Sequence, residues 1–540
     1  MLIKTNTFTL FLFLCFILFS SSLFSETLTE PSILPELKKP EFVKDSENLP
    51  FILPELPVSK PAVTQDHSEK KILVKEIRFS GNTLITETEL LNESSDYIGH
   101  EITVADLEML RQRLTRYYIE QGFINSGLVF DRPAINKGVL RFIVIEGRLT
   151  GINITGNERL DERYISSRLS KNTGDFLNVN QLRENFQVLL DDPLFDRLNA
   201  RIIPGENRGE ALLDLDVHRS RPFDFFAYLN NSRAPSIGAE AIGLNGRVRN
   251  ITGRGDTLAF SLEGSATGEP GHSYNLLWNV PVNFTGTGLS ASINRSNTSL
   301  VEEPIASLFL DSVLETKKIG LHHMFIDRLR HKLSAGVDYQ YETNLTKIDG
   351  VPFSFIPNEP TGKAKTKSWM FWQEYIYRTE NRVMALRSTF SSTDSNLRDD
   401  ITAPSATRIP DVSYNYWIGQ AQFAQLFADK GFQLNLRLTG QFTDDNLLSM
   451  DHISIGGMYS VRGFRENQLV RDNGFYTNLE LEYPLVKNPD YGDLTVKPFL
   501  DYGKAWNTKG TSDELFSIGL AFLYEFKGLK LDLAWAEGLK

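Results

Sequence analysis

The sequence predicts a mainly β fold with a smaller α+β part: two small mixed domains, followed by an antiparallel β-barrel of about sixteen strands of the outer-membrane type. Three observations predict it. A pattern of strand, helix, helix and strand occurs twice in the first part of the chain, strands with a period of two fill residues 221–540, and an export-type segment stands at the start. Together they indicate an exported chain that enters a membrane through strands rather than helices.

The first residues are typical of a secretory signal peptide. Lys4 precedes an apolar run from Phe8 to Phe19, and a serine-rich stretch follows. A spanning helix needs roughly 18 or more apolar residues, so we expect residues 1–25 to be a cleaved signal rather than an anchor. Cys15, the single cysteine, lies in this segment. The mature chain is therefore expected to have no disulfide, no thiolate nucleophile and no thiolate metal site.

Composition and motifs argue against two classes of function. The 540-residue chain has a net charge of -11 and shows no basic stripe with interleaved aromatic residues, so nucleic acid is not an expected partner. It lacks a Gly-x-Ser-x-Gly elbow, a His-Glu-x-x-His motif and a phosphate loop. His322 and His323 are adjacent on a predicted strand and point to opposite faces. We expect no catalytic residue, no metal site and no cofactor.

Residues 26–71 form a proline-rich arm. They contain seven prolines, and the sequence Ile-Leu-Pro-Glu-Leu occurs twice among acidic and lysine residues. This composition predicts a semi-extended linker rather than a stable long helix.

Residues 72–147 and 148–219 form two related units. The segment IRFSGN, which starts at Ile77, is repeated as INITGN at Ile152, and each alternates like a strand before a Gly-Asn turn. Short polar residues that can cap helices follow at equivalent positions: Thr86 and Thr103 in the first unit, Asp161 and Asn178 in the second. Each unit is expected to place two helices between its first and last strands.

Apolar residues in the second helix of each unit follow helical spacing. They are Leu107, Leu110, Leu114 and Tyr117 in the first unit, and Leu182, Phe186 and Leu189 in the second. We expect these faces to pack on the closing strands, at residues 138–147 and 211–218. The result would be two small α+β domains.

The remaining chain, residues 221–540, alternates with a period of two. In one predicted strand the apolar face consists of Phe432, Leu434, Leu436, Leu438 and Phe442. A soluble sandwich with one buried face is the alternative. However, apolar faces with aromatic ends persist to the end of the chain, and no helical segment covers them. The pattern therefore favours an outer-membrane barrel that is apolar towards lipid and polar towards the lumen.

Fifteen candidate strands can be counted in this region. They begin near residues 223, 237, 256, 272, 287, 313, 331, 367, 381, 411, 431, 474, 493, 513 and 528. If the two small domains stay in the periplasm, the first strand runs outward and each connection after an odd-numbered strand lies outside. The segment from Asp451 to Tyr476 follows the eleventh strand and so belongs to an outer connection, where long loops are expected.

We expect this connection, residues 444–473, to fold back into the lumen. A solvated surface loop is the alternative, but it would leave six apolar residues in water: Ile453, Ile455, Met458, Tyr459, Val461 and Phe464. Gly456, Gly457 and Gly463 allow close backbone approaches. Folding inward would bury the apolar groups and bring Arg462 into a restricted interior.

A buried arginine needs a carboxylate partner. Alternation on the thirteenth strand directs Lys497, Phe499 and Asp501 towards the lumen, so Asp501 is a candidate. Glu480 and Glu482 on the twelfth strand are competing partners.

Several segments carry a resemblance to one family. LTRYYIEQGFINSGLVF and KGVLRFIVIEGRL are similar to a first polypeptide-transport-associated (POTRA) domain, and the second unit is similar to the next one. GRVRNITGRGDTLAFSLEGS resembles the first barrel hairpins, ISIGGMYSVRGF a lumen-inserted loop, and FLDYG a motif on the barrel wall. The family is that of the two-partner secretion transporters, also called the haemolysin secretion/activation or filamentous-haemagglutinin transporter family, relatives of the barrel-assembly proteins.

The resemblance implies roles for particular residues. Arg462 would contact Asp501 and pin the inserted loop to the wall. The loop signature comprises Gly456, Gly457, Ser460, Val461, Gly463 and Phe464, and the wall motif adds Phe499 and Gly503.

It also implies a function and a location. POTRA domains in the periplasm would capture an unfolded haemolysin- or adhesin-like exoprotein, and a monomeric barrel in outer-membrane lipid would pass it outward without ATP. A barrel-assembly insertase would share the barrel and the loop, and a passive porin would leave the two domains unexplained. Two POTRA-like units after a proline-rich arm favour secretion.

Two features depart from the family pattern. The family has sixteen strands, so one further strand is expected, either missed in the count or missing after the fifteenth. The family often threads an N-terminal helix through its pore, but residues 26–50 contain prolines and show no amphipathic pattern. We expect no such helix here.

Overall fold

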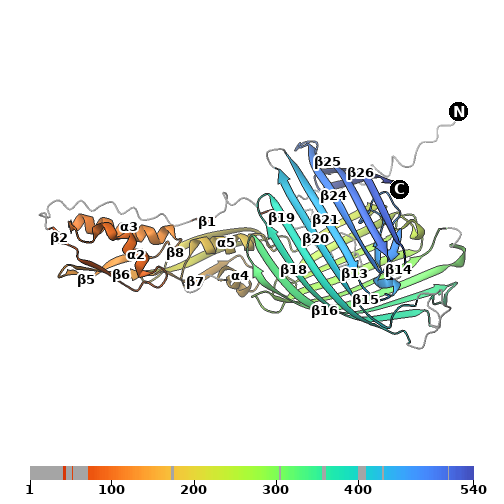
Figure 1. Ribbon diagram of the computed structural model, residues 1–540, viewed down its shortest axis with the longest axis horizontal. Helices are drawn as coiled ribbons and strands as arrows, with labels where there is room; N and C mark the ends of the chain where they lie inside the picture. The colour runs from red at the N-terminus through yellow and green to blue at the C-terminus, as the bar shows by residue number, and fades with distance from the viewer. Residues whose placement is uncertain are drawn as a thin grey trace.

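The computed structural model describes residues 41–43, 51–52, 71–171, 176–302, 306–355, 361–398, 409–427, 431–508 and 510–539. Two small domains lie in a row beside a large barrel with long tilted strands (Figure 1). The expected signal segment lies outside the described residues, as does most of the proline-rich arm. Within the described ranges, no helix is long and apolar enough to cross a bilayer.

The first domain contains two principal helices and a three-stranded sheet. Its elements are β2 (Ile72–Leu73), β3 (Glu76–Ser80), α2 (Glu87–Glu93), η2 (Ser95–Tyr97), β4 (Glu101–Ile102), α3 (Val104–Glu120), β5 (Gly127–Asn136) and β6 (Val139–Ile145). β6 is the central strand, parallel to β3 and antiparallel to β5. Thr86 and Thr103 cap the two helices as predicted, because each hydroxyl accepts a backbone N–H of the first turn.

The core of the first domain differs from the prediction at one residue. Leu107, Leu110 and Leu114 are buried as expected, but the next buried residue of α3 is Tyr118 and not Tyr117. Tyr117 only packs at the edge of this cluster. Positions three and four residues after Leu114 both lie near the same helix face, so spacing alone did not separate them.

The second domain repeats this arrangement. Its elements are β7 (Arg148–Thr155), α4 (Glu162–Leu169), α5 (Val179–Leu190), β8 (Phe195–Pro204) and β9 (Glu210–Arg219). Asp161 and Asn178 are the N-caps of α4 and α5, as predicted. The sheet order is β1-β8-β9-β7, in which β1 (Phe51–Ile52) comes from the arm and pairs in parallel with β8.

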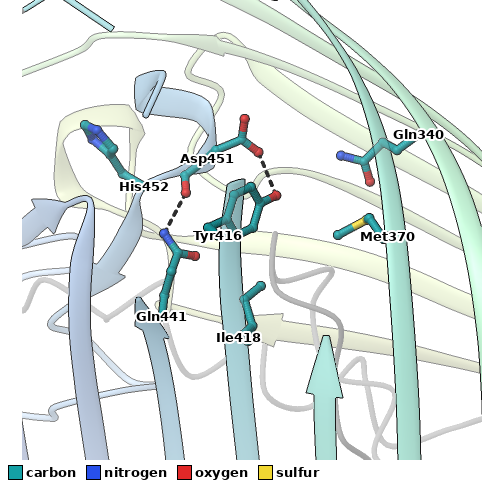
Figure 2. A pocket seen from close by; sticks show the side chains of 7 residues that line it. All are labelled: Gln340, Met370, Tyr416, Ile418, Gln441, Asp451 and His452. Atoms are coloured by element: carbon teal, nitrogen blue, oxygen red, sulfur yellow. Dashed lines mark hydrogen bonds between the residues drawn. The ribbon is translucent and has the colours of Figure 1, made fainter. Parts of the chain in front are cut away.

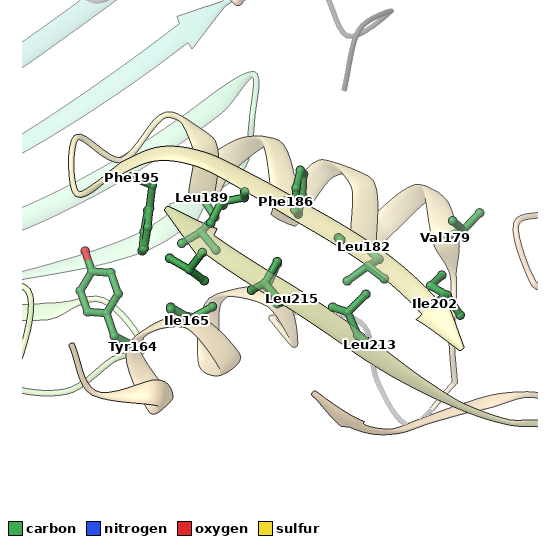
Figure 3. Packing of buried hydrophobic residues seen from close by; sticks show 14 of the residues in the cluster. Tyr164, Ile165, Val179, Leu182, Phe186, Leu189, Phe195, Ile202, Leu213 and Leu215 are labelled. Carbon is green, nitrogen blue, oxygen red and sulfur yellow. The ribbon is translucent and has the colours of Figure 1, made fainter. Parts of the chain in front are cut away.

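The predicted apolar face of α5 forms the centre of this domain. Leu182, Phe186 and Leu189 are fully buried and lie between the helix and the strands β8 and β9 (Figure 3). Leu213 and Leu215 of β9 contribute from the sheet side. The closing strand therefore packs on the apolar face of the helix, as predicted.

Phe186→Ala should destabilise the second domain by about 3–5 kcal/mol, because it removes a buried ring and leaves a cavity. Limited proteolysis of the full-length protein in detergent would measure the effect. Cleavage within residues 148–219 should accelerate, while the gel shift between boiled and unboiled barrel stays unchanged. Arg201→Ala is the control, since Arg201 is exposed and pairs with Asp214 at the surface. Equal protease sensitivity of the two variants would contradict the prediction.

The barrel wall contains the fifteen predicted strands, each close to its expected start. They are β10 (Phe223–Asn230), β11 (Ala241–Arg249), β12 (Thr257–Ser265), β13 (Gly271–Pro281), β14 (Thr287–Ser299), β15 (Leu310–Asp327), β16 (His331–Ile348), β18 (Lys363–Arg378), β19 (Arg382–Ser395), β20 (Ser413–Phe427), β21 (Phe432–Phe442), β24 (Asn473–Val486), β25 (Asp493–Trp506), β26 (Ser512–Phe526) and β27 (Leu529–Leu539). Neighbours in the chain pair antiparallel throughout. The sixteenth member of the sheet is β17 (Val351–Pro352), a short strand on β16, rather than a further wall strand among the described residues.

The alternation predicted for the strands is confirmed on β26. Phe516, Ile518 and Phe522 are exposed on the outer face, whereas Leu515 and Ser517 are buried on the inner face. An apolar outer face is what a lipid environment requires.

The second domain is fixed to the end of the barrel at which the first wall strand, β10, begins. The ring of Tyr164, on α4, lies 6.0 Å from the ring of Phe284 in the turn between β13 and β14. Asp191, which follows α5, forms an ion pair with Arg378 at the end of β18. These contacts hold the domain against the rim opposite to the end from which the inserted loop departs.

Candidate functional site

The connection between β21 and β24 lies against the inside of the barrel wall. It contains η5 (Ser449–Asp451) and a small antiparallel pair formed by β22 (Ile453–Ile455) and β23 (Leu469–Arg471). Ile453, Ile455 and Val461 are completely buried and form one cluster with Ala505 and Leu515 of the wall. The loop lies along the inside of the wall because this position buries its apolar side chains against inward-facing wall residues.

A tight turn precedes the loop arginine. Gly456 and Gly457 have positive φ angles of 118° and 98°, a region that side chains with a Cβ rarely adopt. The Gly456 N–H donates to the Ser460 hydroxyl oxygen at 2.7 Å, and the Gly457 N–H donates to the Val461 carbonyl at 3.0 Å. The signature residues thus shape the backbone that presents Arg462.

Arg462 is held by Asp501 through three hydrogen bonds. Its Nε donates to Oδ2 at 2.8 Å, its Nη2 donates to Oδ1 at 2.9 Å, and its backbone N–H donates to Oδ2 at 3.1 Å. The side chain of Asp501 is 0% exposed and that of Arg462 is 11% exposed. A planar guanidinium that meets a carboxylate through two parallel bonds is a strong and directional contact.

Glu480 shares the arginine. The Nη1 of Arg462 donates to Glu480 Oε2 at 2.9 Å, so both candidate strands supply a carboxylate. Glu482 lies 3.7 Å from the ammonium of Lys497. The phenyl ring of Phe499 lies under the guanidinium, with 3.3 Å from Cζ to the ring centroid, which adds a cation–π contact.

Two further residues at this site were not singled out from the sequence. The side-chain amide of Asn478 donates to Asp501 Oδ1 at 2.8 Å and also to the Ser460 carbonyl. The Nε of Arg437 donates to Asn478 Oδ1 at 2.9 Å. Arg437, Asn478 and Asp501 are direct cross-strand neighbours on β21, β24 and β25. These three polar residues form a row across neighbouring strands, and such a row could have identified Arg437 and Asn478 as site residues. It can be recognised only when the pairing register of the strands is known.

The remaining predicted residues lie where the loop contacts the wall. A Cβ at Gly503 would lie 2.5 Å from Ile455 Cγ2 and 2.9 Å from Val461 Cγ2. Gly463 has a φ of 86°, and its added Cβ would meet Ala536 of β27 at 3.1 Å. The ring of Phe464 lies against Gly538 on the same strand. All eight loop and wall positions and the ion pair therefore belong to one contact region.

This arrangement holds a segment of the chain against the barrel wall. A buried ion pair, a stacked ring and close glycine contacts fix the loop to β24, β25 and β27.

Comparisons with known proteins agree with this reading. The family described as haemolysin secretion/activation protein ShlB/FhaC/HecB matches residues 209–522, and the ShlB-type POTRA domain matches residues 72–147. The outer membrane transporter CdiB of Dickeya dadantii is 22% identical, over 81% of this chain and 76% of that protein.

Solved structures share the fold. CdiB from Escherichia coli superimposes with a TM-score of 0.68 at 19% identity, covering 89% of each chain. BamA from Haemophilus ducreyi, in a form lacking POTRA domains 1–3, gives 0.52 at 14% identity, over 87% of this chain and 96% of that one. Because the family match spans more than half of the chain, the protein belongs to the haemolysin secretion/activation family of outer-membrane transporters, with its POTRA domains in the periplasm.

Proposed function

We propose that this chain receives one unfolded exoprotein, of the haemolysin or adhesin kind, through its POTRA domains and passes it through the barrel to the cell surface. The joint between the second domain and the barrel carries the proposal. The Tyr164–Phe284 and Asp191–Arg378 contacts hold a receiving domain directly at the barrel entrance. A chain captured there has only a short distance to travel to the lumen.

Sheet edges are the proposed receiving surfaces. In the described part of the chain, β3 and β5 are the outer strands of the first sheet, and β7 is an outer strand of the second. Such edges can add an extended peptide through backbone hydrogen bonds, largely independently of side chains. An unfolded exoprotein offers backbone groups of this kind along its whole length.

In the barrel, the proposed role of Arg462 and Asp501 is to lock the inserted loop to the wall. Phe499 and Gly503 are the surface on which the signature residues rest. The barrel would act as a monomer. Its exposed apolar outer face favours a position in outer-membrane lipid.

A gene deletion tests the function. Loss of the gene should lower the amount of one large exoprotein at the cell surface by more than about tenfold, while other outer-membrane barrels assemble normally. The wild-type gene on a plasmid is the control and should restore secretion. A broad loss of barrels would contradict the proposal and favour a barrel-assembly insertase, the alternative to which the structural similarity to BamA points.

Direct binding separates transport from passive diffusion. The purified full-length protein should bind the N-terminal region of the exoprotein that the gene deletion identifies, and should not bind a matched folded periplasmic protein. Absence of affinity for any such region would favour a porin.

A further inference from the structure

A second buried carboxylate lies at the start of the inserted loop. Asp451 precedes β22 and is 6% exposed. Its Oδ2 accepts a hydrogen bond from the hydroxyl of Tyr414 at 2.5 Å, and its Oδ1 accepts one from the hydroxyl of Tyr416 at 3.1 Å. Both tyrosines are on the inner face of β20, and Figure 2 shows the Tyr416 hydroxyl directed at the carboxylate.

Gln441 ties the same place to the other end of the loop. Its side-chain amide donates to the carbonyl of Asp451 at 2.8 Å and to the carbonyl of Asp472 at 3.0 Å (Figure 2 shows the first contact). Asp472 immediately precedes β24. One amide thus joins the entry and the exit of the loop where both leave the wall.

Apolar packing surrounds the carboxylate. Leu447, Leu448 and Met450 of the loop are buried in one cluster with Tyr414, Tyr416 and Ile418 of β20 and with Leu397, which follows β19. In the sheet order, β21 and β24 separate β20 from β25, which carries Asp501. The cluster is therefore a separate contact region from the one around Arg462.

Burying the carboxyl group of Asp451 costs free energy unless its hydrogen-bond partners are present. A carboxyl group buried among apolar side chains is tolerated when hydrogen-bond partners satisfy it, and removing those partners leaves a desolvation penalty. The two tyrosine hydroxyls are such partners, so they favour the position of Asp451 at the wall over positions away from it.

We propose that Asp451, Tyr414 and Tyr416 form a base anchor, a set of positioning residues that keeps the start of the inserted loop on β20 independently of the Arg462–Asp501 contact. The anchor rests on the proposed function, in which the loop must be held in the lumen. If the tip contact opens during transport, the base anchor keeps the loop attached, and the tip returns to the same place.

Thiol labelling tests the anchor without any exoprotein. Cys15 lies in the expected signal segment, so Met450→Cys supplies a single reporter inside the buried cluster. Combining this reporter with Tyr414→Phe and Tyr416→Phe should raise its maleimide labelling rate by about tenfold or more, because two hydrogen bonds to the buried carboxyl group are lost. Asp451→Asn, the milder variant, should give a smaller increase. An unchanged gel shift of the unboiled barrel shows that the wall is intact.

Two further backgrounds make the test specific. Asp513→Asn removes an exposed partner of Arg471 at the loop exit and should leave labelling unchanged. Arg462→Ala should change labelling at position 450 by less than about twofold, because the base anchor holds without the tip. Two results would overturn the proposal: an unchanged labelling rate in the tyrosine variants, or an increase in labelling with Arg462→Ala as large as the increase in the tyrosine variants. Failure of the secretion function alone would leave these labelling rates as predicted.

Discussion

Arg462→Ala should lower the amount of exoprotein at the cell surface by at least about tenfold while the barrel still inserts into the outer membrane. The substitution leaves Asp501 buried without its guanidinium, and breaking a buried pair from one side costs about 3–5 kcal/mol. That penalty falls on the loop, since the strands pair through their own backbones. Secretion is measured by immunoblot of intact cells, and insertion by the gel shift of the unboiled protein.

Two further variants make the result specific. Arg462→Lys should fail almost as completely, because an ammonium cannot reproduce the two parallel bonds to Asp501. Arg465→Ala is the matched control: Arg465 lies three residues away on the same loop, pairs with Glu302, and is 54% exposed. An exposed pair of this kind contributes about 0–1 kcal/mol, so secretion should be unchanged.

Asp501→Ala should reduce secretion about as much as Arg462→Ala. The double variant should lose less secretion than the two single losses combined predict, because neither member of the pair is then left without its partner. Normal secretion by both single variants would disprove the lock.

The pairing of Arg462 with Asp501 could be predicted from the sequence for a simple reason. Side chains on a strand alternate between faces, so an inward Asp501 follows once Leu500 and Tyr502 are assigned to lipid. The same rule places Tyr414 and Tyr416 inward, yet it does not connect them with Asp451. That connection depends on the path of an irregular loop, which periodicity does not encode.

Local signals explain the other successes and misses. The four helix caps were predicted because an N-cap acts within three residues of itself. The burial of Tyr118 instead of Tyr117 depends on how α3 is rotated against its sheet, which is a tertiary property. The pairing of β1 with β8 joins segments far apart in the chain. No local pattern marks either partner.

Gly503→Val should also reduce secretion by about tenfold, through crowding rather than loss of charge. The added Cβ would lie 2.5 Å from Ile455 Cγ2, well inside contact distance, and Ile455 is completely buried. Forcing methyl groups into a packed region costs about 1–3 kcal/mol or more. Since β25 is fixed in the wall, the loop is the part that must move. Secretion and the gel shift of the barrel measure the two effects separately.

Gly264→Val is the matched control for crowding. Gly264 is also a wall residue, on β12, but an added Cβ would meet no atom closer than 3.9 Å. Secretion should therefore be close to normal. Ile455→Ala in the Gly503→Val background should restore part of the lost secretion, because the smaller side chain makes room for the new methyl groups. Ile455→Ala alone should reduce secretion, since it leaves a cavity in the buried cluster around Ile455. If the double variant secretes no better than Gly503→Val alone, the contact between the wall glycine and the loop is not what holds the loop in its working position.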